Sequence, residues 1–325
     1  SCLHRHKSIG SHTAKRISLP PVEAPRLPGA EGGARCVGAV LPSQRGRALG
    51  WVGGSTSYEG HLLMTSGARS GAVRLHVRTF GESAHTAGPP IVLLHGLGVS
   101  SVVWTAFARR QLSDRTVIAP DLRGHGESDR AVDDAYEISD YAIDVAHLIR
   151  DRFHGVAVAL VGHSLGGLVA IEVASRWPEL VSHLAILDPP LDQSHSRDVV
   201  ATVARLRRSP SDELEAYLGG FHGVAAGASL GRLFRAAEAG TYARYLATPP
   251  GASRAWDAAP NVVAQTLLVQ ADVKTDGALS DEVAAEFVRR LPNGRHLHIP
   301  GAAHAVHASH AKEVGEAIRT LIDHG

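Results

Sequence analysis

The stretch Val156-Ala157-Val158-Ala159-Leu160-Val161 runs directly into Gly162-His163-Ser164-Leu165-Gly166, and a further apolar stretch continues to Ser175. The six apolar residues predict a buried strand, and the segment 165–175, which ends before a Trp-Pro pair, predicts a helix. Glycines on both sides of Ser164 permit the tight turn that such a junction needs. In this setting the pattern G-x-S-x-G predicts a nucleophile elbow, with the Ser164 hydroxyl raised above a sheet and a helix N-terminus beneath it.

Short apolar runs alternate with helical stretches from residue 73 to the C-terminal end of the sequence. The spacing of apolar residues predicts helices over 139–153 and 281–291. Regular alternation implies right-handed strand–helix–strand crossovers, and hence a mainly parallel sheet with helices on both faces. The strands are expected at 73–77, 91–94, 117–119, 156–161, 184–187, 267–269 and 296–299.

The overall composition excludes several other classes of protein. The 325 residues include 33 basic and 32 acidic residues, so charge gives no reason to expect nucleic acid or an anionic membrane as partner. No apolar run approaches the roughly 18 residues of a membrane-spanning helix. Because 44% of the residues are hydrophobic, the chain has enough apolar surface for a packed core.

Residues 1–63 differ in composition from the rest of the chain. They carry eight Lys or Arg, three acidic residues and both cysteines, and such a Gly-, Pro- and Ser-rich segment is expected to be disordered. Since Met64 is the single methionine, we interpret 1–63 as a non-native or upstream read-through segment and 64–325 as the folded domain. A targeting peptide and a basic docking tail are the alternatives. The lack of cysteine in 64–325 suits a cytoplasmic location.

Four segments carry a resemblance to the α/β-hydrolase superfamily, and they occur in that family's order along the chain. The resemblance covers essentially all of 64–325. It implies an eight-stranded, mainly parallel sheet with helices on both faces and a helical cap at about 189–260, inserted between strands 6 and 7. The segments are Leu94-His95-Gly96-Leu97-Gly98, Asp121-Leu122-Arg123-Gly124-His125-Gly126-Glu127-Ser128, Gly162-His163-Ser164-Leu165-Gly166-Gly167 and Pro300-Gly301-Ala302-Ala303-His304.

The expected cap departs from strand–helix alternation. Helical pieces are predicted at 197–208 and 212–218. Aromatic residues then follow, and each of them either lines an acyl pocket or packs the cap onto the main domain. These residues are Tyr217, Phe221, Phe234, Tyr242, Tyr245 and Trp256.

A serine hydroxyl becomes an effective nucleophile when a base accepts its proton, and histidine titrates in the required range. The chain has 20 histidines, so abundance does not identify the base. His304 follows the last expected strand and comes after Ser164, as the order Ser, acid, His requires in this fold. We therefore predict His304 as the base, whereas His307 and His310 are expected to face solvent.

The acid that orients the base is harder to place. In most of the family it follows the strand before the last, and Lys274 stands at the position where it is expected. Asp272, two residues earlier, is the predicted acid. Asp276, two residues later, is an alternative, as is Asp188 at the end of the preceding strand, where a minority of relatives carry the acid.

Acyl transfer also needs preorganised N–H donors for the oxyanion, and the resemblance assigns these to the backbone of Leu97 and Leu165. The predicted function is hydrolysis of carboxylic ester, lactone or thioester bonds of a small to medium apolar substrate through an acyl-enzyme, without metal or cofactor. Carbon–carbon bond hydrolysis and perhydrolysis on the same residues are alternatives. A catalytically weak ligand-binding protein is the alternative of a different class, and the displaced acid is the feature that favours it.

Overall fold

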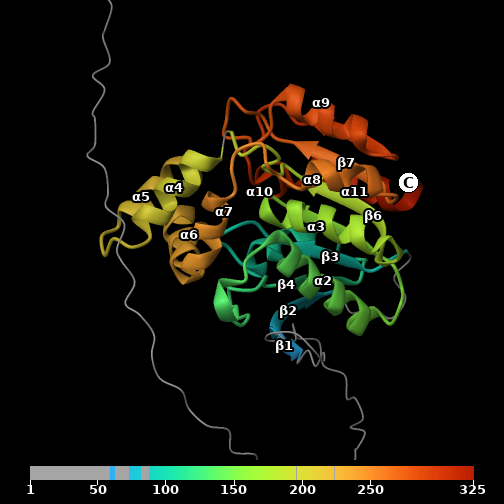
Figure 1. Cartoon of the computed structure of the whole chain (residues 1–325), viewed down its shortest axis with the longest axis horizontal. Helices are drawn as coiled ribbons and strands as arrows, with labels where there is room; N and C mark the ends of the chain where they lie inside the picture. The colour runs from blue at the N-terminus through green and yellow to red at the C-terminus, as the bar shows by residue number, and fades with distance from the viewer. Residues whose placement is uncertain (1–58, 63–72, 82–87, 195, 223) are drawn as a thin grey trace, which may run out of the picture. The chain divides into compact units, whose positions relative to one another are not determined.

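The computed structural model describes residues 59–62, 73–81, 88–194, 196–222 and 224–325. Its strands are β1 (Glu59–Leu62), β2 (Leu75–Phe80), β3 (Ile91–Leu94), β4 (Val117–Pro120), β5 (Val158–His163), β6 (Val181–Leu187), β7 (Gln265–Gln270) and β8 (Gly294–His298). Within the described ranges these eight strands form one sheet in the order β1-β2-β4-β3-β5-β6-β7-β8 (Figure 1). β2 runs antiparallel to β1 and β4, and all other neighbours are parallel, so the sheet is mainly parallel as predicted.

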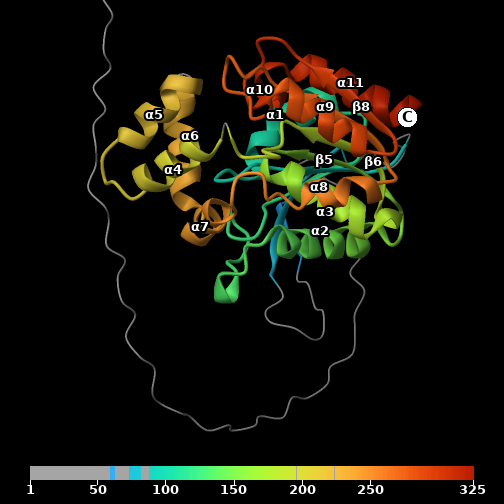
Figure 2. The same ribbon diagram turned by 45° about the horizontal axis from the view of Figure 1, so that its top comes forward.

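Helices cover both faces of this sheet (Figure 2). One face is covered by α2 (Ile138–Phe153), α3 (Leu165–Arg176), α8 (Ala255–Ala258) and α9 (Asp281–Arg290), and the other by α1 (Thr105–Gln111), α10 (Val306–Ser309) and α11 (Ala311–His324). Short 3-10 turns occur at Ser101–Trp104, Val132–Asp134, Pro178–Leu180 and Ala259–Asn261. Among the helices described, none combines the length and the apolar character that crossing a membrane would need.

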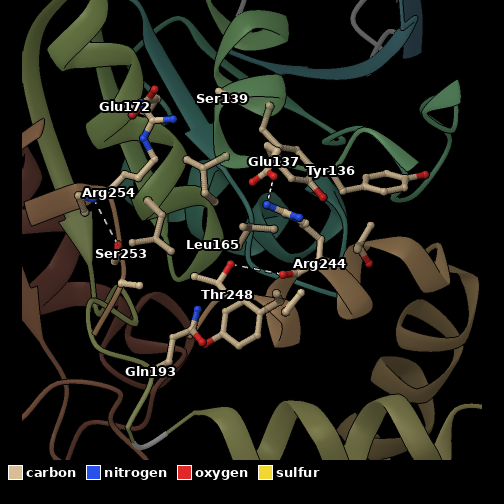
Figure 3. A pocket seen from close by; sticks show the side chains of 18 of the residues that line it. Tyr136, Glu137, Ser139, Leu165, Glu172, Gln193, Arg244, Thr248, Ser253 and Arg254 are labelled. Atoms are coloured by element: carbon tan, nitrogen blue, oxygen red, sulfur yellow. Dashed lines mark hydrogen bonds and ion pairs between the residues drawn. The ribbon is translucent and has the colours of Figure 1, made fainter. Parts of the chain in front are cut away.

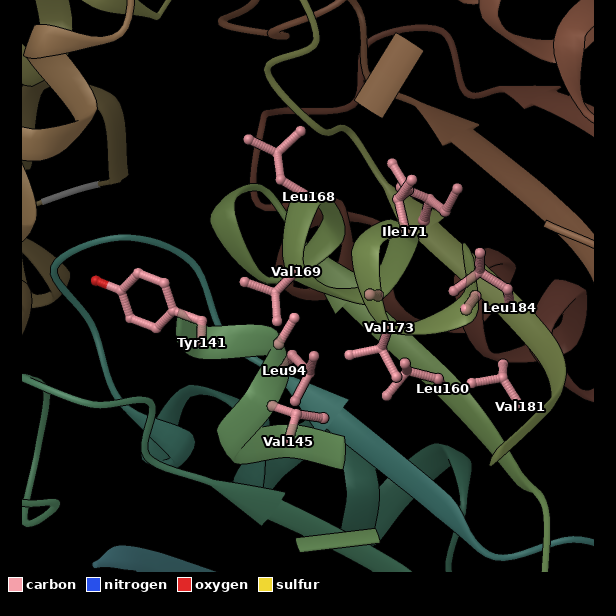
Figure 4. Close-up of a cluster of buried hydrophobic side chains, with 14 of the residues drawn as sticks. Leu94, Tyr141, Val145, Leu160, Leu168, Val169, Ile171, Val173, Val181 and Leu184 are labelled. Atoms are coloured by element: carbon pink, nitrogen blue, oxygen red, sulfur yellow. The ribbon is translucent and has the colours of Figure 1, made fainter. Parts of the chain in front are cut away.

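The largest hydrophobic cluster lies between the sheet and helices α2 and α3 (Figure 4). Every residue of β3, β4 and β5 is buried, and so is α3 from Leu165 to Ala174. Strands that are covered on both faces need no polar alternation, which explains their continuous apolar runs in the sequence. Because α3 begins directly after Ser164, burial of this helix fixes the position of the serine.

The predicted strand bounds are correct where the runs are buried and wrong at their edges. β3 occupies the predicted residues, whereas β5 begins at Val158 because Val156 lies 55% exposed in the preceding turn. β2 continues through the polar pair Arg78-Thr79, which is held in register with β4. Pairing with a neighbour therefore extends a strand beyond its apolar residues.

The folded unit begins before Met64, which corrects the predicted domain boundary. β1 pairs with β2 from Glu59, opposite Arg78, to Leu62, opposite Leu75. Its sequence Glu-Gly-His-Leu contains no apolar run, so the neighbouring strand rather than local composition makes it a strand. The predictions for 1–58 and for Met64 itself concern residues outside the described ranges.

Four helices between β6 and β7 form a cap with a small hydrophobic core of its own (Figures 1 and 2): α4 (Arg197–Leu206), α5 (Glu213–His222), α6 (Val224–Ala236) and α7 (Ala239–Ala247). Leu97, in the loop after β3, contacts both this core and the main core. Trp256 instead packs on Phe287 of α9, with the ring centroids 5.5 Å apart. The aromatic residues are expected either to line an acyl pocket or to pack against the main domain, and Trp256 packs against the main domain.

Candidate active site

Ser164 stands at the junction of β5 and α3 in a strained backbone conformation. Its φ of 53° and ψ of −117° lie in a region that L-residues rarely adopt. A Cβ atom on Gly162 would lie 2.2 Å from the Gly166 carbonyl oxygen, and one on Gly166 would lie 2.5 Å from the Leu94 oxygen. Both glycines are therefore required by close backbone approach.

His304, in the loop after β8, is hydrogen-bonded to Asp188, which directly follows β6. The Nδ1 atom of His304 lies 2.6 Å from Oδ2 of Asp188. The Asp188 side chain is fully buried, and its oxygens accept bonds from the backbone N–H groups of Ala271 (3.1 Å) and Ala278 (2.8 Å). Three donors thus hold this carboxylate in one orientation against the imidazole.

The prediction of Asp272 as the orienting acid is wrong about the contact, because its carboxylate points elsewhere. Its oxygens accept bonds from the backbone N–H groups of Lys274 and Gly301, both at 2.9 Å. Asp276 accepts a bond from the backbone N–H of His304 at 2.5 Å, so it supports the loop and not the ring. Of the three carboxylates, Asp188 is the one placed on the His304 ring.

The environment of His304 favours its protonated form. Burial alone would lower the pKa of His304, but the hydrogen bond to Asp188 and the charges of Asp188 and Asp276 raise that pKa above its usual value. Because Nδ1 is bound to Asp188, Nε2 is the ring atom left to accept a proton. Ser164 and His304 line the same two cavities, which brings the predicted nucleophile and the predicted base to one site.

Two other imidazoles lie close to His304, and their pKa values are shifted in the opposite direction. His163 donates from Nε2 to the His304 carbonyl oxygen (3.0 Å), and burial holds its pKa well below the usual value. His307 stacks on Trp104 with ring centroids 4.2 Å apart, and burial lowers its pKa to about 3. The prediction that His307 faces solvent is wrong, since it is only 4% exposed. Of the three rings, His304 is the one whose pKa its surroundings raise.

The expected oxyanion donors lie beside the nucleophile. A Cβ atom on Gly96 would lie 3.3 Å from the Ser164 Cβ, so the loop that carries Leu97 passes directly against the serine. His95 fixes this loop, because its Nδ1 donates to the Gly96 oxygen and its Nε2 accepts from the backbone N–H of Leu122, both at 2.8 Å. Leu165 is the first residue of α3, where a backbone N–H has no acceptor within the helix.

The cavity at Ser164 and His304 has two lobes. The cap lobe, of about 140 Å³, is enclosed mainly by cap helices and also contains Asp276. The wide lobe, of about 630 Å³, lies between α6 and the loops after β3 and β8. Leu97, Phe234 and His222 contribute to both lobes. Most other lining side chains are apolar or aromatic, including Val200, Val203, Tyr217, Tyr242 and Tyr245 in the cap lobe and Val99, Val103, Leu230 and Leu233 in the wide lobe.

A third cavity, of about 280 Å³, lies apart from this site (Figure 3). It is lined by residues of α2, α3 and α7, including the Glu137–Arg244 ion pair, and by neither Ser164 nor His304. The side chain of Tyr245 borders both this cavity and the cap lobe. Within the described residues, no cluster of three His, Cys, Asp or Glu side chains could hold a metal ion.

Comparisons with known proteins agree with this architecture. The model of the Alpha/beta hydrolase family matches residues 91–317. The solved structure of an esterase from Thermogutta terrifontis superposes with a TM-score of 0.65 at 23% identity, covering 81% of this chain and 98% of that one. The structure of E-2-(acetamidomethylene)succinate hydrolase gives a TM-score of 0.59 at 27% identity, covering 77% of this chain and 96% of that one.

Curated relatives match over shorter stretches. A 2-(acetamidomethylene)succinate hydrolase from Mesorhizobium japonicum is 37% identical over 46% of this chain and 53% of its own length. Lipase LipV from Mycobacterium tuberculosis is 37% identical over 39% of this chain and 47% of its own length. The chain thus spans about half the length of these two relatives. Since the family model covers more than half of the chain, the chain belongs to the alpha/beta hydrolase family.

Proposed function

We propose that the protein is a serine hydrolase that cleaves carboxylic ester, lactone or thioester bonds of a small to medium, largely apolar substrate. The observation that carries this proposal is the hydrogen bond from His304 to the buried Asp188, in a cavity that also exposes Ser164 on its elbow. One of the curated relatives named above is a lipase by name, a class of enzyme that cleaves ester bonds. The apolar walls of both lobes support an apolar acyl or leaving group.

In the proposed reaction, the Ser164 Oγ attacks the substrate carbonyl carbon while its proton passes to Nε2 of His304. The carbonyl oxygen takes the negative charge and accepts hydrogen bonds from the N–H groups of Leu97 and Leu165. The tetrahedral intermediate collapses, the bond to the leaving oxygen or sulfur breaks, and His304 returns its proton to that atom. A water molecule, deprotonated by His304, then hydrolyses the acyl-Ser164 ester and restores both residues.

Asp188 stabilises the imidazolium that forms in each half of this reaction. Its carboxylate is buried and bonded to two backbone N–H groups, so it presents its charge to Nδ1 without reorganisation. The alternative of a catalytically weak binding protein rested on an acid displaced from the base. Because Asp188 contacts His304 directly, that reason no longer favours it.

A fluorophosphonate probe tests the proposal, because it forms a stable bond only with an activated serine. We expect intact-protein mass spectrometry of the full chain to show one probe adduct, located on Ser164. Labelling should be lost in Ser164→Ala and strongly slowed in His304→Ala. Ser139→Ala, at the separate third cavity, is the matched control and should be labelled like the parent. An unlabelled parent protein would contradict the proposal.

The raised pKa of His304 predicts the acid limb of the pH profile. The base must be neutral to accept the Ser164 proton, so kcat/KM should fall as pH drops through this pKa, which lies above the usual 6.5. Asp276→Asn removes one of the charges that raise the pKa, and the limb should move to lower pH. The position of this acid limb is measured from kcat/KM for an uncharged aryl ester between about pH 5 and pH 9. Asp151→Asn, an exposed change on α2, is the control, and a limb at or below pH 6.5 in the parent would disprove the assignment.

A further inference from the structure

We propose that the cap lobe is a subsite for a positively charged terminal group, of the quaternary ammonium type, and that Asp276 is its specificity-determining residue. This inference rests on the proposed function and names the substrate class for the same site. It predicts that cationic esters react faster than uncharged ones of equal shape, and that anionic ones react slowest. The charges around the lobe, its aromatic walls and the nearby cations carry the argument.

The first observation is the charge of the lining. Of the described residues that line either lobe, none is Lys or Arg, and the one carboxylate is Asp276. Asp276 uses one oxygen for the backbone N–H of His304, which places its charge beside the catalytic histidine. Asp188 adds a second, buried negative charge behind the same ring. An anionic group in the lobe would therefore meet like charge and no Lys or Arg side chain among these lining residues.

Three of the four imidazoles that line the cavity do not offset this charge, and the fourth, His304, must be neutral to act as the base in the proposed mechanism. Burial lowers the pKa of His163, His222 and His307, so all three are neutral near pH 7. Backbone N–H groups at Leu97 and Leu165 point to the reacting carbonyl oxygen in the proposed mechanism. They are thus not available to a carboxylate elsewhere in the substrate.

The second observation is the aromatic wall. Tyr217, Phe234, Tyr242 and Tyr245 line the cap lobe together with Asp276. Two of the hydroxyls are already bonded, Tyr242 to the Phe234 carbonyl (2.9 Å) and Tyr245 to Ser196 (2.6 Å), which leaves mainly their rings for a ligand. Aromatic rings attract cations through their negative faces, and a quaternary ammonium loses little hydration on entering such a site. The lobe volume of about 140 Å³ suits a group of this size.

The third observation is that the two nearby arginines, Arg207 and Arg197, already donate hydrogen bonds to backbone carbonyl oxygens. Arg207 lies 4.9 Å from the Tyr242 ring centroid, but its guanidinium donates to the carbonyl oxygens of Phe234, Arg235 and Ala237. Arg197 donates to the carbonyl oxygens of Leu246 and Thr248. Neither side chain lines a lobe, so neither is placed to bind a substrate carboxylate.

The test uses substrates that differ only in the terminal group. Thioesters are made with a trimethylammonium, a tert-butyl or a carboxylate terminus, once on the acyl side and once on the thiol side, and thiol release by the full chain is followed. In the placement that reaches the cap lobe, we expect kcat/KM to fall from cation to uncharged to anion, with about 10- to 100-fold between cation and anion. In Asp276→Asn this ratio should shrink by about tenfold.

The quantity compared is the ratio of kcat/KM for the cationic thioester to that for the anionic one within the same variant. Any effect of Asp276→Asn on His304 changes the rates of all three substrates alike and cancels in this ratio. Asp257→Asn, an exposed change on α8, is the matched control and should keep the parent ratio. Equal rates for the three termini in both placements, or a ratio that Asp276→Asn leaves unchanged, would overturn the inference while the serine hydrolase proposal stands. Turnover of none of the thioesters, with no labelling of Ser164, would overturn both.

Discussion

Replacing Asp188 with asparagine is expected to lower kcat for an uncharged aryl ester by about 10⁴-fold. The Nδ1 atom of His304 now donates to the Asp188 carboxylate, which leaves Nε2 free to accept the Ser164 proton. An asparagine amide would donate to Nδ1 instead and shift the ring proton to Nε2. The base would then be in the wrong tautomer, and the imidazolium of the transition state would lose its counter-charge.

Asp272→Asn is the matched control for this prediction, since the sequence pattern favours Asp272 as the acid. Its carboxylate accepts bonds from the backbone N–H groups of Lys274 and Gly301 and does not contact the His304 ring. We expect kcat within about threefold of the parent, because the amide oxygen preserves one of these bonds. Thermal melts should show that both variants remain folded. Comparable losses in the two variants would contradict the assignment of Asp188.

The parts of the fold that the sequence predicts well are those whose burial is complete. β3 and α3 are apolar along almost their whole length, so their runs mark both position and type. β1 and the polar end of β2 depend on pairing with the neighbouring strands β2 and β4 of the sheet. Such pairing leaves no local pattern, so the composition of residues 59–62 does not indicate a strand there.

The candidate site also has one part that the local sequence predicts and one part that depends on long-range contacts. The elbow at Ser164 has a local cause, because Gly162 and Gly166 are needed by contacts within a few residues and with the adjacent strand. The choice of acid is a long-range property. Asp188 reaches His304 because the carboxyl ends of β6, β7 and β8 lie side by side in the sheet, and residue spacing in one loop cannot show this.

The burial of His307 was missed for a related reason. It lies three residues after His304, on the short helix α10, and a histidine near the start of the final helix is expected to face solvent. Its contact with Trp104 comes from the 3-10 turn after β3, which the sequence does not connect to this helix. His307 also meets His163, with the ring centroids 4.7 Å apart.

Removing the Asp144 carboxylate is expected to cause the largest loss of stability. Arg123 donates to Asp144 through Nε (2.6 Å) and Nη2 (2.7 Å), and both side chains are less than 10% exposed. Asp144→Ala would leave the guanidinium buried without its counter-charge. The free energy of unfolding should fall by about 3–5 kcal/mol, measured by urea denaturation.

The exposed pair Arg150–Glu179 is the matched control for this prediction. Its side chains are 40% and 60% exposed and 3.0 Å apart, so Glu179→Ala should cost less than about 1 kcal/mol. The double variant Arg123→Met, Asp144→Leu replaces both charges with apolar groups and should be more stable than Asp144→Ala alone. If Asp144→Ala and Glu179→Ala destabilise equally, the buried pair does not have this role.

This ion pair also bears on the active site through one chain of contacts. Arg123 follows Leu122, whose backbone N–H is bonded to Nε2 of His95, and His95 fixes the loop that carries Leu97. A variant that loosens Arg123 should therefore disturb the oxyanion donors before it unfolds the chain. In Asp144→Ala, at temperatures where it remains folded, we expect kcat to fall while KM changes little, because the oxyanion contact is made only in the transition state. An unchanged kcat would show that the His95 loop is held independently of this ion pair.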